Sequence, residues 1–162
     1  MRLFIGIKLD NRVNSIINKI CDNLYNEGIR GNYTNKNNIH LTLSFLGEIN
    51  ESKVKEITEV IDSLDVTNIK EIKITGISVL KDMIILNVEK SKELDCLYNE
   101  LYNKLINLNY KLDNRHFFPH ITLVREKNKD YKKGLELVST FTKVTLFESK
   151  RINGVLTYVP LN

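Results

Sequence analysis

Apolar and polar residues alternate along seven stretches of the chain, and this period of two predicts β-strands. The clearest case is the opening stretch, where Leu3, Ile5 and Ile7 are separated by single residues. Elsewhere apolar residues recur at intervals of three and four, which is the spacing of one helix face. The predicted strands are 3–9, 39–47, 70–80, 83–90, 120–125, 143–150 and 155–161, and the predicted helices are 13–24, 54–64, 94–108 and 130–140.

Capping and turn residues stand where these elements should begin or end. Asp10, Asn50 and Ser91 each precede a helical pattern, and all three residue types are favoured N-caps. The pair Lys81-Asp82 separates two strand patterns and predicts a tight hairpin. Asn153-Gly154 does the same near the end of the chain and is a strong hairpin signal.

The order of elements repeats weakly, since each half of the chain reads strand, helix, strand with the motif H-x-T. His40 follows Leu3 by 37 positions, and His120 follows Met83 by the same 37. The sequence therefore predicts an α+β fold of two lobes related by approximate two-fold symmetry. We expect largely antiparallel sheets that face a central cleft, with helices outside. Because no stretch has the composition of a linker, residues 1–162 are expected to form one bilobal domain.

The two H-x-T strands place histidine and threonine on one face. In a strand, residues two apart point to the same side, so His40 lies with Thr42 and His120 with Thr122. The alternate residues are apolar and should face the core. Two imidazoles across a cleft can act as general base and general acid on a phosphodiester, and hydroxyls can donate to its oxygens. This pattern indicates His40 and His120 as a catalytic pair.

Composition narrows the possibilities only modestly. Lys and Arg number 24 against 20 Asp and Glu, a formal charge of +4 that favours a polyanionic partner mildly. The two cysteines have no C-x-x-C spacing, and free thiols in a reducing compartment are the simplest interpretation. No apolar run is long enough for a signal peptide or a membrane span. We therefore expect a cytoplasmic protein without a membrane partner.

The stretches HLTLSFLG (40–47) and FFPHITLVR (117–125) resemble the two signature motifs of the 2H phosphoesterases. Within that superfamily the chain is most similar to the RNA 2′,3′-cyclic phosphodiesterase family, also called 2′-5′ RNA ligase-like. The opening RLFIGIKL and the closing LFESKRINGVLTYVPL resemble the first and last strands of the same family. The resemblance thus covers nearly the whole chain.

The resemblance implies a role for each of these residues. His40 would be the proton donor and His120 the proton acceptor, while Thr42 and Thr122 would hold the phosphate. Arg125 stands at the family's HITL-x-R position, although strict alternation turns it away from His120 unless the strand bulges. Phe4 resembles an aromatic that could stack a base, but it also fits a core position. The expected partner is RNA with a 2′,3′-cyclic phosphate end, bound by a monomer without metal or cofactor.

Three alternatives remain open at this level. The substrate could be a small cyclic nucleotide derivative, or 2′-5′ ligation could be the relevant reaction. A non-catalytic RNA-end binder would need neither histidine, so two complete H-x-T motifs argue against it. A zinc hydrolase would need about three protein ligands, and no carboxylate or cysteine accompanies the histidines.

Overall fold

The computed structural model describes residues 1–113 and 116–162, which form two antiparallel sheets and three α-helices. The first sheet has the strand order β3-β1-β8-β9 and the second has the order β2-β6-β5-β4-β7. The strands are β1 (Arg2–Ile7), β2 (Asn32–Tyr33), β3 (Leu41–Glu48), β4 (Glu71–Leu80), β5 (Met83–Val88), β6 (His120–Arg125), β7 (Lys133–Thr140), β8 (Val144–Ile152) and β9 (Val155–Pro160).

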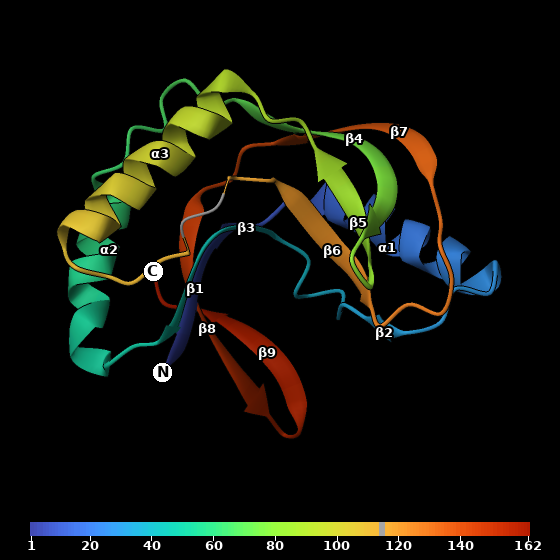
Figure 1. Cartoon of the computed structure of the whole chain (residues 1–162), viewed down its shortest axis with the longest axis horizontal. Helices are drawn as coiled ribbons and strands as arrows, with labels where there is room; N and C mark the ends of the chain where they lie inside the picture. Colours follow the sequence, from blue (N-terminus) through green and yellow to red (C-terminus); the bar gives the residue numbers. More distant parts are fainter. Residues whose placement is uncertain (114–115) are drawn as a thin grey trace.

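The helices cover the outer faces of the two sheets (Figure 1). Helix α1 (Asn11–Asn26) lies behind the second sheet and contacts β7, whereas α2 (Val54–Asp62) contacts β8 of the first sheet. Helix α3 (Lys92–Asn107) packs against α2. Each helix turns an apolar face inward; in α3 this face consists of Leu94, Leu97, Leu101 and Leu105. No described helix is long and apolar enough to cross a membrane.

The predicted two-fold relation is present in the strand orders. In the first half, β1 leads through α1 to β3, which pairs antiparallel with β1. In the second half, β5 leads through α3 to β6, which pairs antiparallel with β5. On the other side of β1 lies β8 from the second half, and on the other side of β5 lies β4 from the first. With β2 and β9 included, each half therefore contributes two strands to the sheet of the other.

The expected caps and turns are present as well. The side chains of Asp10 and Ser91 accept hydrogen bonds from the backbone N–H groups three residues on, at the starts of α1 and α3. Asn50 caps a 3₁₀ turn, η1 (Glu51–Lys53), that precedes α2. Asn153 and Gly154 have positive φ angles of 51° and 78°, as the tight β8–β9 hairpin requires.

Two sequence predictions are corrected by the fold. Residues 130–140 were expected to be helical, but Lys133–Thr140 forms β7 at the edge of the second sheet. Leu137 and Ser139 are buried while their neighbours are exposed, so this segment follows the strand period of two. Leu108 was placed on the inner face of a helix, yet α3 ends at Asn107 and the Leu108 side chain is exposed. The short strand β2 had no sequence signal.

Candidate active site

His40 is held at the entrance of β3 by hydrogen bonds to both ring nitrogens. Its Nδ1 lies 2.6 Å from the backbone oxygen of Asn38, and because a carbonyl can only accept, Nδ1 carries a proton. Its Nε2 lies 2.8 Å from Oγ1 of Thr42. In the neutral imidazole the threonine hydroxyl therefore donates to Nε2. This arrangement directs the reactive nitrogen of His40 to the threonine face of the strand.

The ring of His40 is enclosed by aromatic side chains from three strands. Its centroid lies 4.9 Å from that of Phe4 and 5.3 Å from that of Tyr158, which meets it edge-on. This burial lowers the pKa of His40, and the positive charges of Lys8 and Arg125 act in the same direction. The hydrogen bond to the Asn38 carbonyl opposes the effect by favouring the protonated ring.

His120 repeats the same hydrogen bond at the start of β6. Its Nδ1 lies 2.7 Å from the backbone oxygen of Phe118, again two residues earlier in the chain. Nδ1 must therefore donate, and Nε2 faces away from the backbone carbonyl. The ring of Phe118, 5.6 Å from that of His120, is half exposed, so this histidine lies in a more open setting than His40. The two halves thus present their imidazoles in one orientation but with different enclosure.

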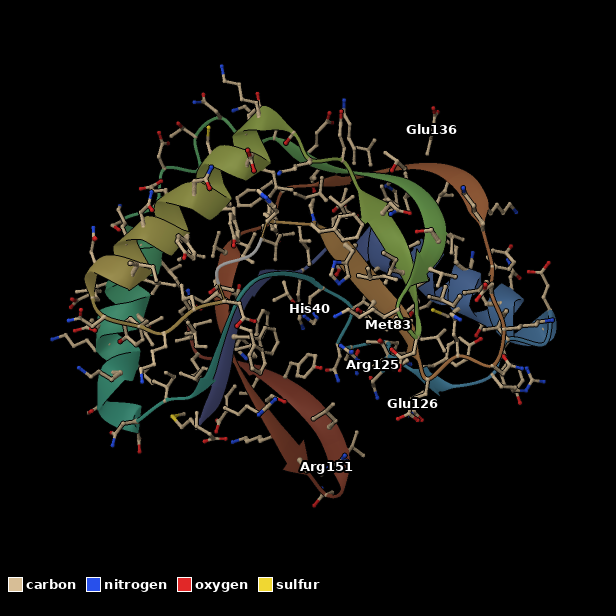
Figure 2. All side chains as sticks on the ribbon, viewed as in Figure 1. His40, Met83, Arg125, Glu126, Glu136 and Arg151 are labelled. Carbon is tan, nitrogen blue, oxygen red and sulfur yellow. The ribbon has the colours of Figure 1, made fainter. Side chains whose placement is uncertain are left out.

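The two histidine strands approach each other across the sheets. β3 contacts β6, and a cavity of about 510 Å³ is lined by Thr42 on one side and by His120 and Thr122 on the other. His40 stands next to this cavity, hydrogen-bonded to Thr42 at its wall. Figure 2 shows the side chain of His40 directed toward the middle of the molecule, where Arg125 and Met83 also point. The structure therefore brings the predicted histidines and threonines to one cavity.

Arg125 reaches the same cavity because β6 bulges. Against β5, Ile84 pairs with Val124 and Ile85 pairs with Thr122, so Leu123 is an extra residue in β6. Leu123 and Val124 are consecutive and both fully buried, which strict alternation does not allow. The bulge restores Arg125 to the face of His120, where its guanidinium donates to the sulfur of Met83 at 3.2 Å.

A matching bulge in β3 turns Phe45 to the cavity, although strict alternation from His40 predicts a core position for it. Gly6 pairs with Thr42 and Ile5 with Ser44, so Leu43 is the extra residue. Phe45 then lines the cavity and is 52% exposed, three positions after Thr42 as Arg125 is three after Thr122. Phe4, in contrast, is 4% exposed and stacks on Phe147. The packing of Phe4 fits the core alternative, whereas Phe45 is an exposed aromatic at the cavity, with the Arg2 guanidinium 4.8 Å from its ring centroid.

Sequence reasoning also did not single out Asn38, which is buried beneath the site. Its side-chain amide donates to the oxygen of Leu156 at 2.9 Å and accepts from the N–H of Tyr158, both in β9. The carbonyl that orients His40 is thereby fixed to a strand 118 positions away. The only available signal for Asn38 was its position two residues before the histidine. Local pattern predicts the strand 155–161 but does not tell which residues that strand lies against.

Among residues 1–113 and 116–162, no three His, Cys, Asp or Glu side chains are grouped so as to hold a metal ion. The ionisable groups that act on His40 are instead two cations and the second histidine. The side chains at this cavity include imidazole, hydroxyl, guanidinium and ammonium groups, which suit a phosphate, and one carboxylate, that of Asp113.

Two sheets whose histidine-motif strands, β3 and β6, contact each other are the arrangement of the 2H phosphoesterases. The sequence model of the AKAP7 2′5′ RNA ligase-like domain matches residues 4–152. The chain therefore belongs to the 2′-5′ RNA ligase-like family of 2H phosphoesterases.

Relatives and solved structures to which the chain is similar agree with this membership. An RNA 2′,3′-cyclic phosphodiesterase of Methanocaldococcus jannaschii is 32% identical over 94% of this chain and 88% of its own length. One from Thermotoga maritima is 33% identical over 78% of this chain and 71% of its own length. The crystal structure of E. coli LigT complexed with 3′-AMP is 25% identical, covers 99% of this chain and 95% of its own, and superposes with a TM-score of 0.81.

Proposed function

We propose that this protein hydrolyses the 2′,3′-cyclic phosphate end of RNA to a 2′-phosphate, with His120 as general base and His40 as general acid. The observation that carries the proposal is the pair of equivalent imidazoles, each held by an Nδ1 bond to a carbonyl two residues earlier. His120 lines the cavity, and His40 hydrogen-bonds Thr42 in its wall. Two relatives that are 32% and 33% identical in sequence are named RNA 2′,3′-cyclic phosphodiesterase.

In the proposed reaction the Nε2 atom of each histidine handles one proton, with the roles that the family resemblance implies. The neutral Nε2 of His120 takes a proton from water as the water oxygen attacks phosphorus. The bond between phosphorus and the ribose 3′ oxygen breaks, and protonated Nε2 of His40 gives its proton to that oxygen. One imidazole gains the proton that the other loses, so the pair needs a proton exchange with solvent before the next turnover.

The remaining cavity residues would bind the substrate. The hydroxyls of Thr42 and Thr122 would donate to the non-bridging oxygens, where charge builds in the transition state. The Arg125 guanidinium would balance the negative charge of the phosphate. The exposed face of Phe45 would stack the terminal base, a contact that tolerates any base identity.

The enzyme is further proposed to act as a monomer in the cytoplasm, without metal. The two free cysteines, one partly buried and one exposed, suit a reducing compartment. Charge stabilisation by the hydroxyls and Arg125 would take the place of a metal ion.

The test is an assay of the purified protein on an oligonucleotide with a cyclic phosphate end, in EDTA. We expect a 2′-phosphate product, and we expect His40→Ala and His120→Ala each to lose about 10²- to 10⁴-fold in kcat/KM. A 3′-phosphate product would refute the assigned geometry. Normal turnover by both variants would refute the mechanism, and activity that needs added zinc would favour a metal hydrolase.

A further inference from the structure

One wall of the 510 Å³ cavity is built from aromatic side chains that the reaction does not use. The rings of Tyr98 and Phe117 stack with centroids 4.2 Å apart and planes 4° from parallel. Tyr102 stands next to Tyr98 at 6.1 Å, and Phe118 is 50% exposed at the same cavity. We call Tyr98, Tyr102, Phe117 and Phe118 the aromatic shelf.

The shelf is rigid because a helix and a catalytic strand hold it. Tyr98 and Tyr102 lie four residues apart in α3, so they share one side of the helix. Buried leucines on the neighbouring face, among them Leu97 and Leu101, anchor α3 in the core. The backbone of Phe118 is held separately, since its carbonyl accepts the hydrogen bond of His120. The shelf therefore begins directly beside the reacting groups.

The shelf also borders a second, smaller hollow. This hollow, of about 290 Å³, is lined by Tyr98, Tyr102 and Phe117 together with Lys90 and other residues. The two hollows thus meet along the aromatic rings. Charged side chains of both signs lie along this path, with Lys81 and Asp113 at the larger hollow and Lys90 and Asp95 at the smaller one. Electrostatic attraction alone is therefore not what distinguishes the path.

We propose that the aromatic shelf binds the base of the nucleotide on the 5′ side of the cyclic end, so that the preferred substrate is an oligonucleotide rather than a cyclic mononucleotide. This inference rests on the proposed function, because the cyclic phosphate must first occupy the histidine pair. Phe118 is exposed and the other three rings are partly buried at the cavity that His120 lines. Stacking of bases on such aromatic rings is how proteins hold single strands without reading sequence. The terminal base would use Phe45, which leaves the shelf for its neighbour.

The size of the preference follows from the stacking of one base. A base stacked on aromatic side chains is expected to raise kcat/KM by about 5- to 150-fold. The comparison uses adenosine 2′,3′-cyclic phosphate, the dinucleotide ApA with a cyclic end, and the same dinucleotide without its 5′ base. We expect the intact dinucleotide to have the higher kcat/KM. The abasic dinucleotide should react like the mononucleotide, because it has no 5′ base to stack on the shelf.

Variants locate the effect on the shelf. Tyr102→Leu and Phe118→Leu should each reduce the ratio of kcat/KM for the dinucleotide to that for the mononucleotide, and the second keeps the carbonyl that orients His120. Tyr25→Leu, at an exposed tyrosine that lines neither hollow, is the matched control and should leave the ratio unchanged. The ratio cancels any general loss of activity.

The outcomes separate this inference from the function on which it rests. Equal kcat/KM for mononucleotide and dinucleotide would overturn the shelf while the phosphodiesterase activity stands. An advantage that survives removal of the base, or that both shelf variants retain, would also overturn it. Failure of the wild-type protein to open any of the three substrates would instead refute the proposed function itself.

Discussion

At the scale of single residues, the site pairs two histidines that share a tautomer but differ in environment. Both Nδ1 atoms donate to a backbone oxygen two residues earlier. His40 is enclosed by Phe4 and Tyr158, whereas His120 adjoins the half-exposed ring of Phe118. Their local sequences are nearly the same, so the different roles proposed for them depend on these surroundings.

The lowered pKa of His40 predicts how activity depends on pH. In the free enzyme, burial and nearby cations make His40 lose its proton below its ordinary pKa of about 6.5, so kcat/KM should fall on the alkaline side from that lower pH. A bound anionic phosphate favours the protonated ring and raises its pKa, so the alkaline fall of kcat should lie at higher pH. Full pH profiles of both parameters check this.

A variant ties that alkaline limb to His40. Lys8→Gln removes one of the positive charges that lower the pKa of His40, so the limb of kcat/KM should move to higher pH. Coincident limbs for kcat and kcat/KM in the wild-type protein, or no movement in the variant, would contradict the assignment.

Asn38 is expected to position His40 without touching substrate. Asn38→Ala leaves the Leu156 carbonyl and the Tyr158 N–H without their partner, which should destabilise the fold by about 1–3 kcal/mol. The backbone carbonyl of residue 38 would then no longer be fixed to β9, so it would not hold His40 in one orientation. We expect this to lower kcat by roughly tenfold to hundredfold. Asn37→Ala, at an exposed asparagine, is the control.

Urea unfolding and steady-state kinetics measure the two effects. Nitrogen NMR of the imidazoles shows the tautomer directly, and His40 in Asn38→Ala should populate both forms. If the variant loses stability but keeps the wild-type kcat and a single His40 tautomer, Asn38 is only structural.

At the scale of elements, the strands depart from strict alternation where the site needs them to. The bulges at Leu43 and Leu123 return Phe45 and Arg125 to the cavity face. Gly6 lets β1 approach β3 closely, since a Cβ there would lie 2.8 Å from the Leu41 oxygen and 3.3 Å from the His40 ring. These features set the catalytic face more finely than the period of two does.

Gly6→Ala should therefore damage catalysis as well as stability. The added methyl group must push Leu41 and His40 away, which we expect to cost about 1–3 kcal/mol of stability and up to about a hundredfold in kcat. Gly134→Ala is the matched control, because a Cβ in this strand position of β7 meets no atom within 4 Å. Equal effects of the two substitutions on kcat would argue against the close approach.

The local sequence pattern predicted the elements that have one apolar face packed on the core. It failed where pairing with a neighbouring strand determines the structure. The alternation around His40 and His120 placed both histidines and their threonines on the cavity face. The bulges depend on the neighbouring strands, so Phe45 was missed and Arg125 was left undecided. The edge strand β7 was predicted to be a helix because its few apolar residues fit either period, and pairing with β4 decided the outcome.

At the scale of the whole molecule, the two sheets are interlocked. β4 follows the first histidine strand yet lies in the second sheet, and β8 lies in the first sheet beside β1. Neither sheet is complete without a strand from the other half of the chain. The cavity between β3 and β6 therefore lies between two sheets that are each built from strands of both halves of the chain.

This interlocking leads us to propose that residues 1–162 unfold as one cooperative domain. Urea titrations followed by NMR signals of Ile5 in β1 and Ile85 in β5 should give one midpoint for both sheets. Far-ultraviolet circular dichroism should give the same midpoint. Two separate transitions, one for each sheet, would show that the lobes are independent units.

The exchanged strands also determine what happens when the chain is expressed as two separate fragments. A break in the Lys81-Asp82 turn would leave the first fragment with β1 and β3 of the first sheet and with β2 and β4, which belong to the second. The second fragment would keep β5, β6 and β7 of the second sheet and carry β8 and β9, which belong to the first. Neither piece would have a complete sheet to fold around, but each would have the strands that its counterpart lacks. The two fragments should therefore assemble only with each other. If each fragment were fused to a different protein, recovery of the folded domain would indicate that the two fused proteins had come together.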